Sequence, residues 1–538
     1  MWLPTLVSTL FLAEAIWRFV DEGDTVEQRA SAIFNGVNLV IFALLGLSCV
    51  SWPLISAKFQ GQKDEKNVES EEKAKDEVVV VVERQDSLSV LKAARSIIHG
   101  GRRDDDKKAE VSSSPPADAP ASPASADAPE LPALSPAPAP APKRQVTYLT
   151  NLKTFLTFIV VAHHTVCIFT VDAGGIQTNA VYGTLGKVDF SYSNFYFGAH
   201  WFTGVNQMYF MAAFFLISAY FCPKSLDRKG FRVFVLDKIV RIGGGYLLYS
   251  AFLGPLLGLW IRAYFGEPLR YQYGPGTTWF LLWLLNFQLI YAALAQVLPS
   301  LRFNMPHPLV LVFAIGGVLC GLWAAMLYAL NDGASPWMMF GEMNKWQYGI
   351  ALYIPFFYAG IVGGRNNWLQ SVEEMKKWVV WVLRAYVVAI MVTDLLSIIS
   401  AGKGNHGIHI SPKWSIVMPT YAVAMTLVMM QLFHQYFNAT PQSKLMKHAG
   451  VAAYTVYIIQ FWPMQLVMLT YVEILKAAGV PIVFEGWTFF TVNAAGQPAV
   501  LSEACMWGGW VFVFVVTQAL VWPMGYYMRK LPVLNKML

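Results

Sequence analysis

Long apolar runs separated by short polar segments fill most of this chain, and they restrict its fold more than any other feature. Each run is about 20 residues long, which lets a helix cross a hydrocarbon layer of about 30 Å. Backbone groups inside a bilayer must be hydrogen-bonded internally, which favours helices. The pattern predicts an all-α fold, a polytopic transmembrane bundle of about ten core helices. Ten runs follow residue 150: 152–171, 203–222, 242–262, 277–297, 308–330, 348–366, 377–400, 414–436, 449–475 and 504–527.

Composition separates this class from its alternatives. Of 538 residues, 55% are hydrophobic and only 14% are charged, whereas a soluble domain carries roughly 25% charged residues. These values argue against a soluble globular protein, a disordered chain and a disulfide-stapled secreted protein. The net charge of +6 is small for this length and gives no support for nucleic-acid binding. We therefore expect a lipid bilayer as a partner and no nucleic acid.

The first 56 residues hold two more apolar stretches, 2–20 and 32–56. The second is long enough to span a bilayer. The first is either another membrane helix or a signal peptide with an A-x-A-like site at 13–15, although it lacks a basic start. We predict an N-terminal transmembrane helix or hairpin over 1–56, with a possible signal peptide in 1–15.

Residues 57–146 have the composition of a disordered linker. Residues 57–110 carry 12 basic and 13 acidic side chains, and residues 111–146 carry two basic and three acidic ones. These are 30 of the 74 charged residues in the chain. Ten prolines follow between Pro115 and Pro142. Such a segment buries too little apolar surface to offset the entropy lost on ordering. We predict a disordered linker ahead of a transmembrane domain over 147–538.

Charge in the segments between the runs predicts the orientation. Residues 223–241 carry six basic and two acidic side chains, a balance of +4. The positive-inside rule places such a segment in the cytoplasm. Alternation of the runs then places the linker and the C-terminus in the cytoplasm as well.

Lys153 and His164 form the first candidate site. At 100° per residue their separation of eleven residues leaves them about 20° apart around a helix and about 16 Å apart along it. Ionisable groups inside a membrane span usually face a polar interior. This stripe suits an anionic ligand entering from the cytosol, with His164 as a general base toward a hydroxyl. In the alternative interpretation, Lys153 is an interface anchor and His164 is a packing residue. The side chain of His163 points about 100° away from that of His164 around the helix.

Further polar residues extend this candidate site. Lys238 and Arg241 share a helical face at i, i+3 and can pair with phosphates, although a basic cluster can also serve only as a topology signal. Asp394 is either an orienting carboxylate for a histidine or a locally paired side chain. The remaining candidates for binding are Asn206, Gln207, Tyr457 and Gln460, with Tyr454 on the same stripe as the last two.

The five cysteines do not indicate a metal site. None forms a CxxC pair, and all lie in or beside apolar runs. Pairs of that kind are what zinc sites and disulfide frameworks show. We therefore expect small core residues and no metal.

Four blocks of the sequence resemble acyltransferase family 3, the polytopic membrane acyltransferases. YLTNLKTFLTFIVVAHHT resembles its opening span, with Lys153 at the family's arginine position and His164 at its histidine position. NQMYFMAAFFLISAYFCPKSLDRKGFRVFVLDKIVR resembles the next block and its paired basic residues. GTTWFLLWLL at 276–285 and AAYTVYIIQFW at 452–462 resemble two later elements. The resemblance covers roughly 147–530, with the blocks in the expected order.

This resemblance implies a function. Family members move an acyl group from cytoplasmic acyl-CoA to a hydroxyl, often of a carbohydrate, with the buried histidine as the catalytic residue and the basic residues near the acyl-CoA. The expected enzyme is an O-acyltransferase that transfers groups other than aminoacyl groups, here an acetyl group. It would use acyl-CoA as a substrate and hold no permanent cofactor.

Departures from the family pattern keep rival readings open. Lysine replaces arginine at Lys153, alanine replaces glycine at Ala219, a triple glycine follows Arg241, and Gln460 replaces a late histidine. Lysine keeps the charge but loses the bidentate fork. The rivals are a non-enzymatic transporter and a catalytically degenerate scaffold.

Overall fold

The computed structural model describes eight stretches of the chain, 147–169, 194–323, 347–401, 412–439, 443–485, 488–499, 501–532 and 534–537. The predicted N-terminal helix or hairpin at 1–56 and the predicted linker at 57–146 lie outside these residues. All the described residues belong to one compact unit.

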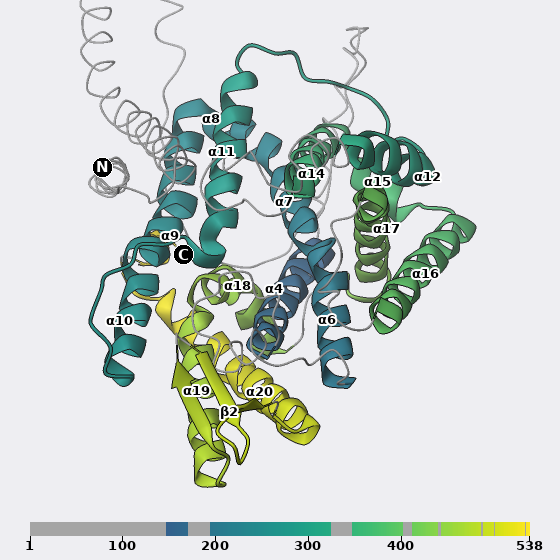
Figure 1. Ribbon diagram of the computed structural model, residues 1–538. Coiled ribbons are helices and arrows are strands. Elements are labelled where there is room, and N and C mark those ends of the chain that lie inside the picture. The colour runs from purple at the N-terminus through teal and green to yellow at the C-terminus, as the bar shows by residue number, and fades with distance from the viewer. Residues whose placement is uncertain are drawn as a thin grey trace, which may run out of the picture. The chain divides into compact units, whose positions relative to one another are not determined.

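Helices make up nearly all of this unit (Figure 1). Segments η1, η2 and η4 are π-helical and η3 is a 3₁₀ turn. In chain order the elements are α4 (Thr147–Cys167), α6 (Asn194–Gln207), α7 (Phe210–Tyr220), α8 (Cys222–Lys238), η1 (Ile239–Gly243), α9 (Gly244–Leu247), η2 (Leu248–Leu253), α10 (Gly254–Tyr264), η3 (Gly276–Thr278), α11 (Trp279–Leu294), α12 (Pro308–Val310), η4 (Leu311–Gly321), α14 (Gln347–Asn366), α15 (Trp368–Glu373), α16 (Lys377–Ala401), α17 (Pro412–Tyr436), α18 (Lys444–Ile459), α19 (Phe461–Ala477), β1 (Ile482–Glu485), β2 (Thr488–Val492), β3 (Pro498–Ala499), α20 (Glu503–Met528) and α21 (Leu534–Met537).

Each of the ten predicted runs falls on a helical segment where the structure describes it. Six of the described helices are long and apolar enough to cross a membrane, and the bent pair α18–α19 would make a seventh. The helices α4 and α14 have 21 and 20 residues but are not among the six. Polar side chains such as Lys153 and His164 lower the hydropathy of α4. The protein is a multi-pass helical membrane protein, and the count of ten spans stays a prediction.

The basic segment 223–241 is helical, where the sequence suggested a connection between two spans. Residues Cys222–Tyr264 form one run of helix, with a break at Gly230, whose φ of 70° is a left-handed value. Glycine takes this value without a steric penalty. The π-helical segments η1 and η2 follow, and such insertions often occur at functional sites. They place Arg241 and Tyr249, respectively.

The segment between the apolar runs 449–475 and 504–527 contains a small antiparallel sheet in the order β1-β2-β3. Val483 pairs with Phe490 and Thr491 with Ala499. Aromatic and β-branched residues dominate β1 and β2, which favours strands. The turn before β3 is closed by Asn493, whose side-chain oxygen accepts from the backbone N–H groups of Ala495 and Gln497.

Helix α4 occupies the interior of the unit (Figure 1). It contacts α6, α7, α17, α18 and α20. Its buried residues point in all directions around the axis and include Tyr148, Leu152, Val160 and Val161. A helix with buried side chains on all sides of its axis lies in the interior of a protein, surrounded by other elements. The polar side chains of α4 therefore face other helices of the protein.

Helices α7 and α14 pack in close contact because α14 carries glycines where the backbones meet. A Cβ atom on Gly360 would lie 2.4 Å from the carbonyl oxygen of Leu216, and one on Gly364 would lie 2.3 Å from that of Tyr220. Small residues allow this kind of backbone approach between membrane helices. The packing holds the end of α7, and with it the start of α8, against α14.

We predict that Gly360→Ala lowers the stability of the folded protein by about 1–3 kcal/mol, because the added methyl group overlaps backbone atoms that have no room to move. Thermal unfolding of the purified protein in detergent measures this. Gly258→Ala is the matched control, since a Cβ there meets nothing within 4 Å. Equal melting temperatures for the two variants would contradict the tight α7–α14 contact.

Candidate active site

His164 lies in the last turn of α4, which ends at Cys167. Its ring is 5.2 Å from the ring of Phe461 and 5.4 Å from that of His163, centroid to centroid. His163 packs in turn on Phe210, with ring centroids 5.3 Å apart. The Nδ1 atoms of both histidines are buried and have no hydrogen-bond partner among the described residues. Buried polar atoms of this kind need an explanation, and a bound substrate or ion is one.

The structure brings the three predicted basic residues together at the other end of α4. The ammonium of Lys153 lies 5.3 Å from the ring centre of Phe221, and that of Lys238 lies 5.1 Å from the ring centre of Phe234. Arg241 is near enough to repel both ammonium groups.

This cluster of Lys153, Lys238 and Arg241 holds unbalanced positive charge. The adjacent Asp237 pairs with Lys229 at 2.9 Å. No described carboxylate forms a salt bridge with any of the three. Like charges in a partly desolvated place repel strongly, so the cluster favours an anion, and phosphate oxygens suit it through charge-assisted hydrogen bonds.

Helix α18 links this basic cluster to His164. The hydroxyl of Tyr454 donates to the backbone carbonyl of Arg241 at 2.8 Å. One turn further, the hydroxyl of Tyr457 donates to the backbone carbonyl of Thr277, and its ring lies 6.0 Å from that of Phe280. Phe461 completes the stripe against His164. The predicted stripe of α18 thus passes from one part of the site to the other.

A sharp bend at Gln460 positions Phe461. Helices α18 and α19 meet there at 68°. The side-chain amide of Gln460 donates to the carbonyl of Tyr457 at 3.0 Å, while its oxygen is buried and has no partner among the described residues. Broken helices in membrane proteins often form binding sites, because their ends expose unpaired backbone groups.

Two predicted binding residues, Asn206 and Gln207, lie at the end of α6. Asn206 is buried and donates to the carbonyl of Phe202 in its own helix at 2.7 Å. Gln207 ends α6, one turn before Phe210. Neither amide hydrogen-bonds to His164 within the described part of the chain. Their role in substrate binding stays a prediction.

Asp394 lies on α16, which contacts α6 and α17. It is 2% exposed, and its Oδ2 has no partner in the described ranges. Its charge acts on Tyr421 of α17, whereas the neighbouring charge that acts on His164 is that of His163. Helix α16 thus packs on two of the helices that contact α4, and the role of Asp394 as an orienting carboxylate stays a prediction.

Two aromatic residues of the site escaped prediction from the sequence. Phe461 follows the predicted Gln460 directly but carries no chemical signal of its own. Tyr249 lies in η2, with its ring 6.3 Å from that of Phe461, and its place depends on a π-helical segment that the sequence pattern does not reveal. Both rings are buried and form an apolar wall beside His164.

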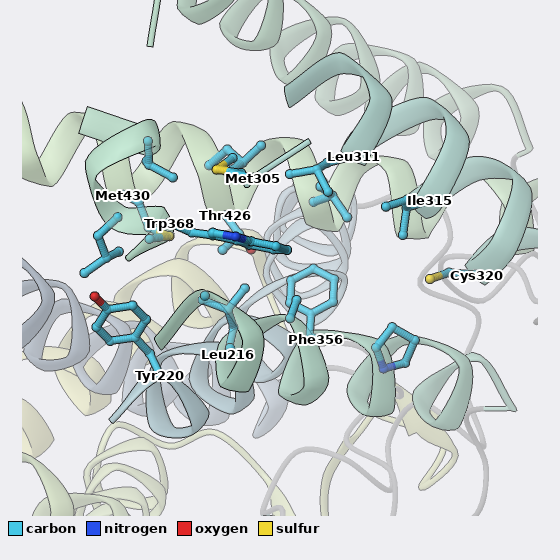
Figure 2. A pocket seen from close by; sticks show the side chains of 18 residues that line it. Leu216, Tyr220, Met305, Leu311, Ile315, Cys320, Phe356, Trp368, Thr426 and Met430 are labelled. Atoms are coloured by element: carbon cyan, nitrogen blue, oxygen red, sulfur yellow. The ribbon is translucent and has the colours of Figure 1, made fainter. Parts of the chain in front are cut away.

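A separate cavity of about 100 Å³ lies among α7, η4, α14, α15 and α17. Figure 2 shows Leu216, Phe356, Leu311 and Trp368 pointing into it, with Tyr220 at one side. Its lining is almost entirely apolar, and none of the predicted site residues belongs to it. So apolar a lining suits hydrocarbon better than acyl-transfer chemistry.

Comparison with known proteins agrees with this geometry. A family profile described as an acyltransferase domain, acyltransferase 3, matches residues 146–529. The chain belongs to acyltransferase family 3. No curated protein and no solved structure is significantly similar to it. The predicted resemblance is confirmed, and the protein is a membrane acyltransferase.

In this acyltransferase, three of the departures from the family pattern lie at different parts of the site: the basic cluster, the bend between α18 and α19, and the contact between α9 and α18. Lys153 lies in the basic cluster, where a lysine still supplies the charge. Gln460 lies at the bend beside Phe461. The glycines after Arg241 let α18 approach, because a Cβ on Gly245 would lie 2.4 Å from the hydroxyl oxygen of Tyr454. The triple glycine is therefore part of how this acyltransferase joins α18 to the basic cluster.

We predict that Gly245→Ala and Tyr454→Phe have strongly non-additive effects on stability. Gly245→Ala alone should cost about 1–3 kcal/mol, because its methyl group displaces the Tyr454 hydroxyl. Tyr454→Phe alone should cost about 1 kcal/mol for the hydrogen bond to Arg241. The double variant should be closer to Tyr454→Phe than the sum predicts, since the clashing hydroxyl is gone. Denaturation of all four proteins measures the coupling, and simple additivity would refute this contact.

Proposed function

We propose that this acyltransferase takes an acyl group, acetyl in the simplest case, from acyl-CoA and transfers it to a hydroxyl of a carbohydrate or a similar acceptor. The observation that carries the proposal is the connection between the basic cluster and His164. They lie toward opposite ends of α4. Tyr454 of α18 contacts the basic cluster at Arg241, and Phe461, at the start of the next helix α19, packs against His164. One extended ligand with phosphates at one end and a reactive thioester at the other matches this arrangement.

The donor's phosphates would bind the basic cluster. Lys153, Lys238 and Arg241 offer cationic donors that form no salt bridge with a described carboxylate, and Phe221 and Phe234 flank two of them. The pantetheine arm would follow α18 past Tyr454 and Tyr457 toward Phe461. The positive-inside rule places this end in the cytoplasm, where acyl-CoA is available, and the same rule keeps the linker and the C-terminus on that side.

His164 would act as the general base. Its imidazole takes the proton of the acceptor hydroxyl while the hydroxyl oxygen attacks the thioester carbonyl. A tetrahedral intermediate forms, its C–S bond breaks, and the imidazolium returns the proton to the departing CoA thiolate. The new ester and free CoA are the products, and the histidine ends as it began.

The start of α19 would stabilise the oxyanion of that intermediate. Helix α19 begins at Phe461, whose ring lies against His164, so the positive end of its dipole is beside the reacting group. Backbone N–H groups at a helix start suit a developing negative charge. Pro463, which has no N–H, limits these donors to the first residues of α19.

We predict that His164→Ala lowers acyl transfer by roughly 10²–10⁴-fold, the usual contribution of a general base. Purified protein is supplied with labelled acetyl-CoA, and both thioester hydrolysis and transfer to added sugars are measured. His448→Ala is the control, because that histidine is exposed and stacks on Tyr526. Equal turnover by wild type and His164→Ala would refute the mechanism. Absence of turnover in all three, across acyl chain lengths, would favour a degenerate scaffold or a transporter.

We predict that Lys153→Gln and Lys238→Gln each raise the KM for acyl-CoA roughly 10- to 100-fold with a smaller effect on kcat, because each removes one charge-assisted contact to a phosphate. Initial rates at varied acyl-CoA concentration measure this. Lys447→Gln, at an exposed position of α18, is the matched control for lost charge. A fall in kcat without a change in KM would place these lysines outside the donor site.

A further inference from the structure

Three soft or borderline metal ligands meet at the end of α4. One ligand atom from each of His163, His164 and Cys167 lies within 4.8 Å of the other two. Around the helix, Cys167 falls about 40° from His163, between His163 and His164, which are about 100° apart. The thiol is therefore flanked by both imidazoles. The sequence suggested no metal site, because it lacks CxxC pairs, but this constellation needs only one cysteine.

Burial and hydrogen bonding favour a ligand at this place. His163 is 8% exposed and Cys167 is 3% exposed. The Nδ1 atoms of both histidines are buried and unpaired among the described residues. An imidazole nitrogen without a hydrogen-bond partner is an available metal ligand.

The helix end adds to this preference. Helix α4 ends at Cys167, so the carbonyl groups of its last turn point past these side chains. The negative end of a helix dipole stabilises a nearby cation. The end of α4 thus favours a cation, although the start of α19 beside His164 has the opposite polarity, so the argument for a metal ion depends on the three ligand atoms.

We propose that His163, His164 and Cys167 bind a Zn²⁺ ion that inhibits the enzyme. Two imidazoles and a thiolate are a ligand set typical of zinc, and a fourth position stays open. Bond lengths of about 2.0–2.3 Å hold tetrahedral ligand atoms roughly 3.3–3.6 Å apart, so the site closes by small side-chain rotations. A Zn–S bond forms as the S–H bond breaks, and the proton passes to solvent.

The inhibitory effect rests on the proposed function. A zinc ion on His164 takes up the lone pair that would otherwise accept the proton of the acceptor hydroxyl. Binding of Zn²⁺ would stop acyl transfer without changing the fold. Removal of the Zn²⁺ by a chelator would restore acyl transfer. Zinc would thereby regulate the site through the same residue that carries the chemistry.

The direct test uses Co²⁺ as an optical probe in place of Zn²⁺. The full-length protein, purified in detergent and stripped of metal, is titrated with Co²⁺. We expect one equivalent to produce a thiolate-to-cobalt charge-transfer band that Zn²⁺ abolishes. Cys167→Ser should lose this band, His163→Ala should weaken binding at least 10-fold, and Cys320→Ser, at another buried cysteine, should keep it. A band that survives Cys167→Ser, or no band in the wild type, would overturn the proposal.

The second test measures inhibition. Zn²⁺ should inhibit acetyl transfer by the wild type and by Cys320→Ser, and excess chelator should reverse this. Cys167→Ser should keep its basal rate but require at least 10-fold more Zn²⁺, and Cys167→Ala replaces it if the serine variant unfolds. Full Zn²⁺ sensitivity in both Cys167 variants would overturn the proposal. The cobalt band needs no turnover, so an inactive protein with the band would refute the proposed function and leave the metal site supported.

Discussion

The structure depends on burying a helix that carries ionisable groups. Helix α4 bears Lys153 near its start and two histidines in its last two turns, and a charged or polar side chain facing lipid is costly. Five helices, α6, α7, α17, α18 and α20, contact α4 and cover most of it, while Thr150 and Phe158 remain exposed. This enclosure turns unfavourable membrane residues into a site. It also explains why α4 is less hydropathic than the helices that meet the criteria for a span.

Irregular helix geometry then places the side chains around α4. The π-helical segments η1 and η2 hold Arg241 and Tyr249, and the bend between α18 and α19 turns Phe461 toward His164. Each irregularity changes the direction of a side chain that a regular helix would present elsewhere. The close approach of Tyr454 to Gly245 joins two of these elements. Together they contact the basic cluster near one end of α4 and His164 near the other.

Much of the fold follows from local sequence pattern, and the exceptions are instructive. The ten apolar runs fall on helical segments because hydrophobic length and periodicity act within each segment. The segment 223–241 was interpreted as a connection because of its charges, yet it continues as helix through Lys238 and Arg241. The pattern of apolar runs gives no sign of the sheet at 482–499, whose strands have only two to five residues. Short strands need partners, and pairing is not visible in one segment alone.

The site likewise combines features that one segment of sequence reveals with features that depend on contacts between segments. The spacing of Lys153 and His164, the basic pair Lys238 and Arg241, and the stripe from Tyr454 to Gln460 were all readable, because helical geometry relates residues a few turns apart. Which helices meet was not readable. Contacts such as Tyr454 with Arg241 and Phe461 with His164 join residues hundreds of positions apart. The sequence alone determined the family, the helical membrane fold and the candidate base. Only tertiary packing decided which candidates share one site, because shape complementarity between helix faces sets those contacts.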